Sequence, residues 1–206
     1  MPQLKPERPR VCLFGGTFDP IHCAHLQIAQ ETVRNFHLDE VLFIPAGNPP
    51  HKQDTQVTPF EDRFAMVALA TAPYPRFIAS RLEEGLAKSF TIDTVRRLRA
   101  ESRERAEFFF LIGADAFNEI ESWREWQQLI TLIEFIVVAR PGDTYRVPEG
   151  ARVQKLEGLA LPVSSSSIRS RIRAGEPTPE LPQAVRAFIE ERGLYGFTKQ
   201  DSIVSR

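Results

Sequence analysis

The sequence predicts an α/β fold: a Rossmann-like open sheet, mostly parallel, with helices on both faces and a small helical portion at the C-terminal end. Two observations predict it. Five or six short apolar runs alternate with segments whose apolar residues recur at helical spacing. The run EFFFLIG at 107–113 is almost continuously apolar and aromatic, which is typical of a parallel strand buried on both faces.

The predicted strands are the apolar runs, most of which end at a glycine or a loop. The first, RVCLF, is closed by Gly15 and Gly16, and the last, RVQKLEG, is the weakest because charges interrupt it. In chain order, we expect strands at 10–14, 40–46, 76–84, 107–113, 135–140 and 152–158.

The predicted helices follow these strands. Thr58, Pro59 and Glu61 indicate a helix start, with a hydroxyl cap, a proline at the first helical position and a carboxylate three residues after the cap. Paired prolines in GNPPHKQDTQ predict an irregular loop before it. We expect helices at 25–36, 60–72, 89–102, 114–130 (as one or two helices), 164–175 and 181–193.

Length and charge limit the classes of protein. The 206 residues predict one domain at 10–198, with a flexible lead-in at 1–9 and a flexible tail at 199–206. The net charge is −1 and no long run of one sign occurs, so a nucleic-acid partner is not predicted. A homo-oligomer is compatible with the sequence, which does not determine the oligomeric state.

Cysteine usage and hydropathy predict the compartment. Cys12 and Cys23 form no disulfide-like or metal-binding pattern, which favours a reducing environment. The N-terminal segment lacks the apolar core of a signal peptide, and no apolar stretch is long enough to span a membrane. We therefore expect a soluble cytoplasmic protein.

The segment GGTFDPIHCAH at 15–25 carries the clearest chemical signal. It follows a predicted strand and opens a helix, and ligands of open parallel sheets collect at that edge. Gly15 and Gly16 would allow a sharp turn and a close approach of ligand to backbone. The helix N-terminus suits phosphate, and His22 and His25, three residues apart, would share one face of its first turn.

Other interpretations of the two histidines are weaker. A lone histidine would most often cap or pack, but two at this spacing after a glycine turn favour an anion site. Neither GxxxxGK[ST] nor GxGxxG occurs here, so a P-loop and a dinucleotide-binding turn are not predicted. A zinc site is also disfavoured, because HExxH is absent and the cysteines complete no tetrahedral set.

The segment resembles the GGxFxPxHxxH signature of the HxGH-motif nucleotidyltransferase superfamily, with Ala24 where glycine is usual. VSSSSIRSRI resembles the second signature of that superfamily, ISSTxIR, and FIPAGNPPHK, SFTIDT, IGAD, SWREW and LPQAVRAFIEERGLYG resemble segments of nicotinate-nucleotide adenylyltransferases. The matches run from about residue 11 to residue 196.

The resemblance implies transfer of the adenylyl group of ATP to nicotinic acid mononucleotide, which yields deamido-NAD and pyrophosphate. Such a reaction needs no protein nucleophile, because it needs two polyanions to be aligned and their charge neutralised. Mg²⁺ is expected through the ATP phosphates, with no dedicated protein ligands.

The resemblance also implies site residues. His22, His25 and Arg169 are expected to be catalytic, through contacts to the ATP phosphates. Substrate contacts are expected from Lys52, Thr91, Trp123 and Arg124, whereas Trp126 is expected in the core. The residues expected at ATP are Gly15, Gly16, Thr17, Phe18, His22, His25, Gly113, Asp115, Ser164, Ser165, Ser166, Ile168 and Arg169.

Three alternatives compete with this interpretation, and the choice between the acid and the amide acceptor is the one that stays open. The same chemistry could act on nicotinamide mononucleotide or phosphopantetheine, or could transfer a cytidylyl group. A nucleotide-binding regulator without catalysis is suggested only by Ala24, and His22, His25 and Arg169 speak against it. An NAD-dependent oxidoreductase is disfavoured because the GxGxxG turn is missing.

Overall fold

The structure is a computed structural model that describes residues 8–48, 57–86, 88–101, 106–140, 142–157 and 162–197. Its centre is a six-stranded sheet in the order β3-β2-β1-β4-β5-β6, with every neighbouring pair parallel. This confirms the predicted α/β class. The strands are β1 Arg10–Gly16, β2 Glu40–Pro45, β3 Phe77–Ala79, β4 Glu107–Gly113, β5 Glu134–Ala139 and β6 Val153–Glu157.

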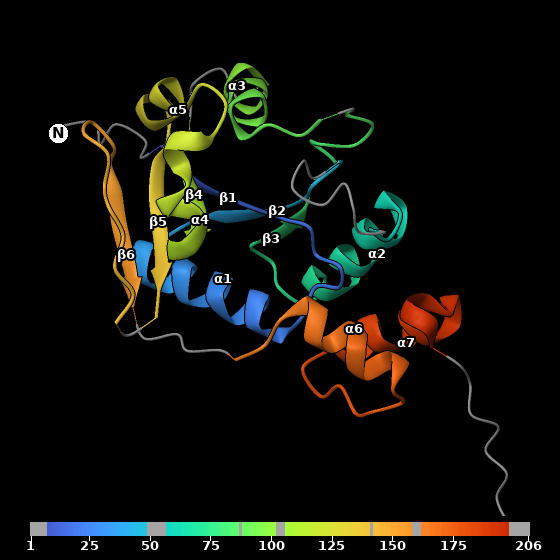
Figure 1. The fold of residues 1–206 in the computed structure, drawn as a ribbon. Helices are drawn as coiled ribbons and strands as arrows, with labels where there is room; N and C mark the ends of the chain where they lie inside the picture. Colours follow the sequence, from blue (N-terminus) through green and yellow to red (C-terminus); the bar gives the residue numbers. More distant parts are fainter. Residues whose placement is uncertain are drawn as a thin grey trace, which may run out of the picture.

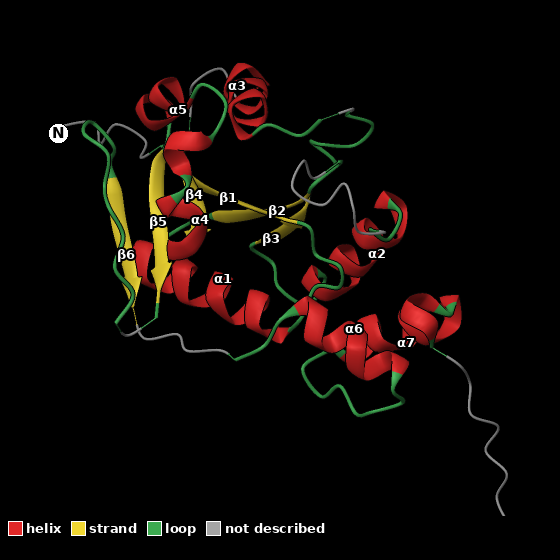
Figure 2. Ribbon diagram, in the orientation of Figure 1, coloured by secondary structure: helices red, strands yellow, loops and turns green. Residues whose placement is uncertain are grey.

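Helices cover both faces of the sheet (Figures 1 and 2). The α-helices are α1 Cys23–Phe36, α2 Phe60–Thr71, α3 Thr91–Glu101, α4 Ala114–Asn118, α5 Trp126–Leu132, α6 Ser165–Arg173 and α7 Gln183–Arg192, and the short 3₁₀ segments are η2 Ile120–Ser122 and η3 Leu194–Gly196.

Alternation along the strands explains why both faces are covered. Side chains of successive strand residues point to opposite faces. Cys12, Phe109 and Leu111 pack into one cluster together with residues of α1, α2, α6 and α7. Leu13 and Phe110 pack into the other, with residues of α3, α4 and α5. Each face of β1 and β4 is therefore a core, as the apolar run at 107–113 predicts.

The C-terminal helices form a unit at one end of the sheet. Figure 1 shows α6 beginning beside the first turn of α1, with α7 next to it. Ile168 and Ile172 of α6 and Val185 and Ile189 of α7 are buried in the same cluster as α1 and α2. The small helical portion predicted from the sequence is thus packed against the segment that carries both histidines.

Two predicted boundaries are wrong. The third strand has three residues, Phe77–Ala79, because only these pair with β2. Thr58 is not the cap of α2: the cap position is Pro59, while the Thr58 amide donates to Asp19 and its carbonyl accepts from Arg63.

The predicted helix at 114–130 is divided into α4, η2 and α5, because Glu125 adopts a left-handed backbone (φ 51°) at the start of α5. In the part of the chain that the structure describes, no helix is long and apolar enough to cross a membrane.

Gly47, just after β2, lies against the backbone of the neighbouring turn. A β-carbon built on it would stand 2.0 Å from the carbonyl oxygen of Glu83. We predict that Gly47→Ala lowers the free energy of unfolding by about 1–3 kcal/mol, because the backbone must shift to accommodate the methyl group. Urea unfolding measures this effect.

Gly113→Ala is the matched control for Gly47→Ala. A β-carbon at Gly113 meets nothing within 4 Å, and the residue has an ordinary extended backbone (φ −73°). Its unfolding free energy should stay within about 0.5 kcal/mol of wild type. Equal losses in both variants would contradict the steric explanation for Gly47.

Candidate active site

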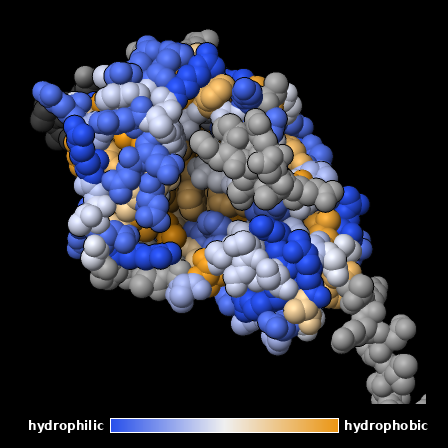
Figure 3. Space-filling model, viewed as in Figure 1, coloured by the Kyte–Doolittle hydropathy of each residue, from blue (hydrophilic) through white to orange (hydrophobic). Residues whose placement is uncertain are grey.

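Two cavities open at the carboxyl ends of β1 and β4. These strands are neighbours, yet their crossovers lead to β2 on one side and β5 on the other, which is where open α/β sheets bind ligands. Phe14, Leu111, Ile112 and Gly113 line both cavities and form their common wall. Figure 3 shows a hollow with an apolar floor between α4 and the C-terminal helices.

The first cavity, here named the histidine cavity, has a volume of about 390 Å³. It lies between the starts of α1 and α6 and the ends of β4 and β5. Predicted site residues that line it are His22, His25, Gly113, Asp115, Ser164 and Ser165. Ala24, at the position where the superfamily motif has glycine, is among the lining residues as well.

The second cavity, here named the tryptophan cavity, has a volume of about 530 Å³. It lies between the end of β2, the start of α3 and the segment after η2. Predicted site residues that line it are Gly15, Gly16, Thr17, Thr91, Gly113, Trp123 and Arg124. The cavity that holds the residues expected at the acceptor is therefore also lined by three residues expected at ATP: Gly15, Gly16 and Thr17. Lys52 lies outside the described residues.

His22 and His25 form a stacked pair at the start of α1. His22 is the residue before the first helical position, and its backbone N–H donates to Nδ1 of His25 at 3.2 Å. The ring centroids are 3.7 Å apart with an interplanar angle of 28°. The Phe18 ring meets the His25 ring edge-on at 5.1 Å, so an aromatic wall supports the pair.

Burial keeps both imidazoles neutral. It lowers the pKa of His22 to about 4, although the negative charge of Glu180 acts in the opposite direction. The pKa of His25 is also well below the usual 6.5, through burial and then through the neighbouring His22. His22 Nδ1 is buried without a hydrogen-bond partner. The pair is therefore uncharged at neutral pH until an anion favours its protonation.

The two glycines act differently from the sequence-based expectation. Neither Gly15 nor Gly16 has a positive φ, so they do not make the turn; Phe18 makes it, with φ 50°. A β-carbon at Gly16 would stand 3.0 Å from the Phe18 ring. Gly16 therefore provides room for the ring that supports His25.

The serines at 164–167 differ in the contacts that they make. Ser164 caps α6 by accepting from the Ser167 amide at 3.2 Å, and its hydroxyl lies 3.1 Å from that of Ser166. Ser165 donates to the carbonyl of Pro20 at 2.9 Å. The hydroxyl of Ser165 is thus already used to hold the loop before α1.

Four predicted ATP residues are not among the residues lining either cavity: Phe18, Ser166, Ile168 and Arg169. Ser166 is exposed. Ile168 is fully buried in the core, and Phe18 is 2% exposed. Arg169 is half-buried, and its Nη1 donates to the carbonyl of Asp19 at 2.7 Å. Arg169 therefore lies next to the loop between β1 and α1, close to the two histidines as the sequence predicts, but its guanidinium already donates to a backbone carbonyl.

The tryptophan cavity places Trp123 and Arg124 opposite the start of α3. The Trp123 ring meets the Phe110 ring edge-on at 6.1 Å. Arg124 forms ion pairs with Asp93 at 3.3 Å and Glu125 at 3.4 Å and lies over the Phe90 ring, so carboxylates already balance its charge. Trp126 is half-buried and packs against the core, as expected.

The sequence-based reasoning missed several residues at the site. Phe14 separates the two cavities, and Ser89 accepts from the amides of Gly47 and Asn48 at 3.0 and 3.3 Å. Asp19 and Tyr195 form a partly buried hydrogen bond at 2.7 Å beside the loop that leads to His22. Only the FDP and GLYG residues of the matching segments could have pointed to this last pair.

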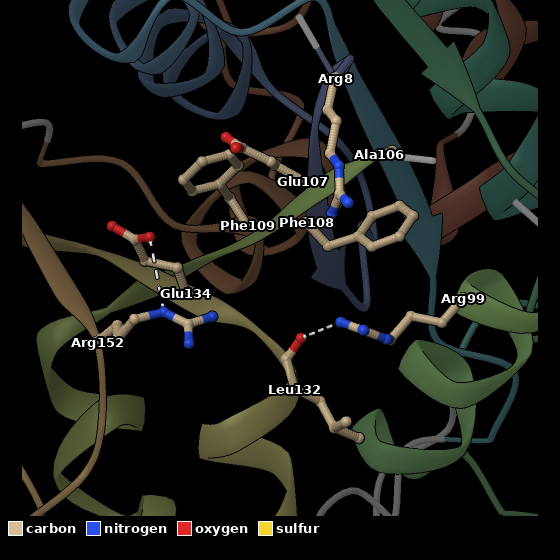
Figure 4. A pocket seen from close by; sticks show the side chains of 9 residues that line it. All are labelled: Arg8, Arg99, Ala106, Glu107, Phe108, Phe109, Leu132, Glu134 and Arg152. Carbon is tan, nitrogen blue, oxygen red and sulfur yellow. Dashed lines mark hydrogen bonds and ion pairs between the residues drawn. The ribbon is translucent and has the colours of Figure 1, made fainter. Parts of the chain in front are cut away.

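A third cavity, of about 290 Å³, lies at the opposite edge of the sheet, where β4 and β5 begin. Figure 4 shows Arg152 directed to Glu134 and Arg99 directed to the carbonyl of Leu132. The separations are 3.9 and 2.7 Å. Arg152 pairs with Glu134, and Arg99 donates to a backbone carbonyl. Parallel sheets bind ligands at the carboxyl ends of their strands, so this cavity is not the candidate active site.

The histidine pair predicts a pH dependence of stability. A folded-state pKa of about 4 against 6.5 means that the unfolded chain binds protons first as the pH falls. The free energy of unfolding should therefore decrease from pH 6.5 toward pH 4, by up to about 3 kcal/mol through His22. Denaturant titrations at several pH values measure it.

His22→Gln supplies the comparison for this pH dependence, because glutamine does not titrate. The decrease between pH 6.5 and pH 4 should be smaller in His22→Gln than in wild type. Parallel curves for the two proteins would show that the imidazole of His22 has an ordinary pKa.

Comparisons with known proteins agree with this geometry. A family model described as cytidylyltransferase-like matches residues 13–171. The chain is 46% identical over 186 residues to a protein of Solibacter usitatus named "Probable nicotinate-nucleotide adenylyltransferase", covering 90% of this chain and 99% of the relative. A protein of Acidothermus cellulolyticus with the same name is 43% identical over 197 residues, covering 91% and 95%.

A solved structure shares the fold. The nicotinic acid mononucleotide adenylyltransferase of Plasmodium falciparum, in complex with NaAD, superposes with a TM-score of 0.75 and 20% identity, covering 92% of this chain and 98% of that one. A second structure of the same protein is a complex with APC. At this identity the likeness shows the fold.

Proposed function

The chain belongs to the nicotinate-nucleotide adenylyltransferases, within the cytidylyltransferase-like family, and from that premise we propose how its two cavities divide the reaction. The enzyme transfers the adenylyl group of ATP to nicotinic acid mononucleotide, forming deamido-NAD and pyrophosphate. The histidine cavity binds ATP, and the tryptophan cavity binds the mononucleotide. The observation that supports this division is the common wall of Phe14 and Gly113 at the switch point of the sheet.

The size and lining of the cavities suit these ligands. Volumes of about 390 and 530 Å³ lie within the range of pockets that hold small molecules. They share lining residues along β4, so we propose that two phosphorylated ligands meet above Gly113. Alignment of two reactants in this way is itself a large contribution to the rate.

The bond changes follow from the two ligands. A phosphate oxygen of the mononucleotide attacks the α-phosphorus of ATP, the bond from that phosphorus to the bridging oxygen breaks, and pyrophosphate leaves with the electron pair. Negative charge builds on the leaving phosphates, so catalysis requires positive charge and donors near them. No covalent intermediate with the protein is needed.

His22 and His25 supply that charge. They are neutral in the free protein because of burial, and a triphosphate beside them favours the protonated form. Protonation then places two donors at the start of α1, where the helix dipole also favours an anion. Ser164, the cap of α6, lines the same cavity, and Arg169, in the middle of α6, contacts the loop before the histidines through the carbonyl of Asp19. Asp115, after β4, is placed to accept ribose hydroxyls.

The acceptor is held by the tryptophan cavity. Trp123 offers an aromatic surface for the pyridine ring, and the start of α3 at Thr91 offers a positive dipole end for the nicotinate carboxylate. Arg124 contributes less charge than the sequence suggests, because Asp93 and Glu125 pair with it. Lys52 stays a predicted phosphate contact outside the described residues.

Mg²⁺ is proposed to accompany the triphosphate. The ion would be held through the phosphate oxygens, with no dedicated protein ligands, and the carboxylates of Asp115 and Asp143 that line the histidine cavity suit its water ligands. When bound, the ion would neutralise charge on the phosphates.

We also propose a reducing, cytoplasmic setting, which the two free cysteines support: Cys12 is buried in the sheet and Cys23 is exposed.

One incubation tests the proposed function. The protein is mixed with ATP, Mg²⁺ and either nicotinic acid mononucleotide or nicotinamide mononucleotide, and the product is identified by mass. We expect deamido-NAD and pyrophosphate, with faster turnover of the acid. Equal rates for both mononucleotides would contradict the acid preference, and no product from either would contradict the function.

We predict that His25→Ala reduces pyrophosphate release by at least about a hundredfold while the protein stays folded, because a donor to the developing charge is lost. A coupled pyrophosphate assay and circular dichroism measure the two quantities. His37→Asn is the control: His37 is exposed at the C-terminal end of α1 with φ 48°, a conformation that asparagine adopts readily. Near-wild-type turnover in His25→Ala would refute the phosphate role.

A second prediction concerns the acceptor. Trp123→Ala should raise the KM for the mononucleotide about tenfold and leave the KM for ATP nearly unchanged, because only ring stacking is lost. Trp126→Ala is the matched change on the same segment, and it should lower stability instead. A rise confined to the KM for ATP would show that the cavities are assigned the wrong way round.

A further inference from the structure

The loop between β1 and α1 is held from outside by segments distant in sequence. Arg169 donates to the carbonyl of Asp19 at 2.7 Å, and Ser165 donates to that of Pro20 at 2.9 Å. The amide of Cys23, the first residue of α1, donates to the carbonyl of Glu180 at 2.8 Å. The C-terminal unit, residues 162–197, therefore forms hydrogen bonds with the chain on both sides of His22.

Asp19 is the most enclosed part of this contact. It is 3% exposed, and each carboxylate oxygen has a donor: Oδ1 accepts from the Tyr195 hydroxyl at 2.7 Å, and Oδ2 accepts from the Thr58 amide at 3.3 Å. Arg63, 2% exposed, lies nearby, but its guanidinium donates to the carbonyls of Thr17 and Thr58. A buried carboxylate that loses one of two donors is expensive, so these contacts fix the loop.

Tyr195 is placed for this contact by an unusual backbone. It lies in η3 with φ 59°, a left-handed conformation that residues with side chains rarely adopt, between Gly193 and Gly196, which also have positive φ. Burial, and then the charge of Asp19, raise the pKa of the Tyr195 hydroxyl far above its usual value. The hydroxyl therefore remains a donor throughout the working pH range.

We propose that Tyr195 and Asp19 are positioning residues for adenylyl transfer. Their hydrogen bond fixes the loop so that His22 and His25 keep their stacked arrangement at the wall of the histidine cavity. This inference rests on the proposed function, and it assigns to the C-terminal unit a part in catalysis without contact to either substrate. The loss of the hydroxyl would let the loop move, and small displacements of a charged donor are costly in rate.

A second contact of the C-terminal unit provides a control. Its loss should lower the stability of the protein without moving the loop that carries His22. Arg192 of α7 donates to Oδ1 of Asp62 in α2 through Nε and Nη2, at 3.2 and 3.0 Å. It joins the C-terminal unit to the body of the protein, as Tyr195 does, but touches neither the loop nor a cavity. Arg192→Met keeps the apolar stem and removes this ion pair, together with the contact of the guanidinium with the Phe188 ring within the same helix.

The test compares Tyr195→Phe and Asp19→Asn with Arg192→Met in the full chain. For each we would measure the unfolding free energy, kcat and both KM values, and the titration midpoint of His22 by NMR. Tyr195→Phe should lower kcat about tenfold to a hundredfold with little change in the KM for the mononucleotide, and should move the His22 midpoint upward as burial is relaxed. Asp19→Asn should do the same, and Arg192→Met should lower stability only.

Two results would overturn the proposal: a kcat in Tyr195→Phe within about twofold of wild type, or an equal loss of kcat in Arg192→Met. If wild type forms no product, the proposed function fails on its own. The His22 midpoints, which need no substrate, then decide the positioning role. A midpoint that moves in Tyr195→Phe but not in Arg192→Met supports it, and unchanged midpoints refute it.

Discussion

The active site depends on the divergence of the chain at the middle of the parallel sheet. β1 and β4 are hydrogen-bonded neighbours, but the connections that follow them turn to opposite sides, so the loops above their ends separate. The gap is divided by Phe14 into two cavities that share the wall made by Leu111, Ile112 and Gly113. Two phosphorylated molecules can therefore be bound by different elements and still meet, which is the main requirement of adenylyl transfer.

Burial gives the histidine pair its chemical character. The same packing that encloses the imidazoles keeps them neutral, and only a polyanion at the cavity offsets the cost of charging them. Under the proposed function, charge would appear where the triphosphate binds, beside the dipole of α1. The arrangement is predicted to lower stability at acidic pH. The hydrogen bonds from the C-terminal unit to Asp19 and Pro20 are proposed to maintain it.

Periodicity predicted the fold well because the apolar runs are long and regular, and the motif placed His22 and His25 correctly at the start of α1. Local sequence patterns gave wrong predictions where contacts between distant residues determine the structure. The sequence predicts that Thr58 caps α2, but its amide donates to the carboxylate of Asp19. The sequence also predicts that Gly16 makes a turn, but Gly16 leaves room for the Phe18 ring. Neither periodicity nor spacing indicates the role of Tyr195, since its partner is 176 positions away, and only the matching FDP and GLYG residues could have pointed to the pair.

The central claim is that phosphate binding charges a buried, neutral histidine pair. NMR titration of His22 and His25, assigned with His22→Gln and His25→Ala, tests it most directly, in the free protein and with an unhydrolysable ATP analogue. Both midpoints should lie below 6.5 in the free protein, that of His22 near 4, and both should rise when the analogue binds. Midpoints near 6.5 in the free protein, or midpoints that do not respond to the analogue, would contradict it.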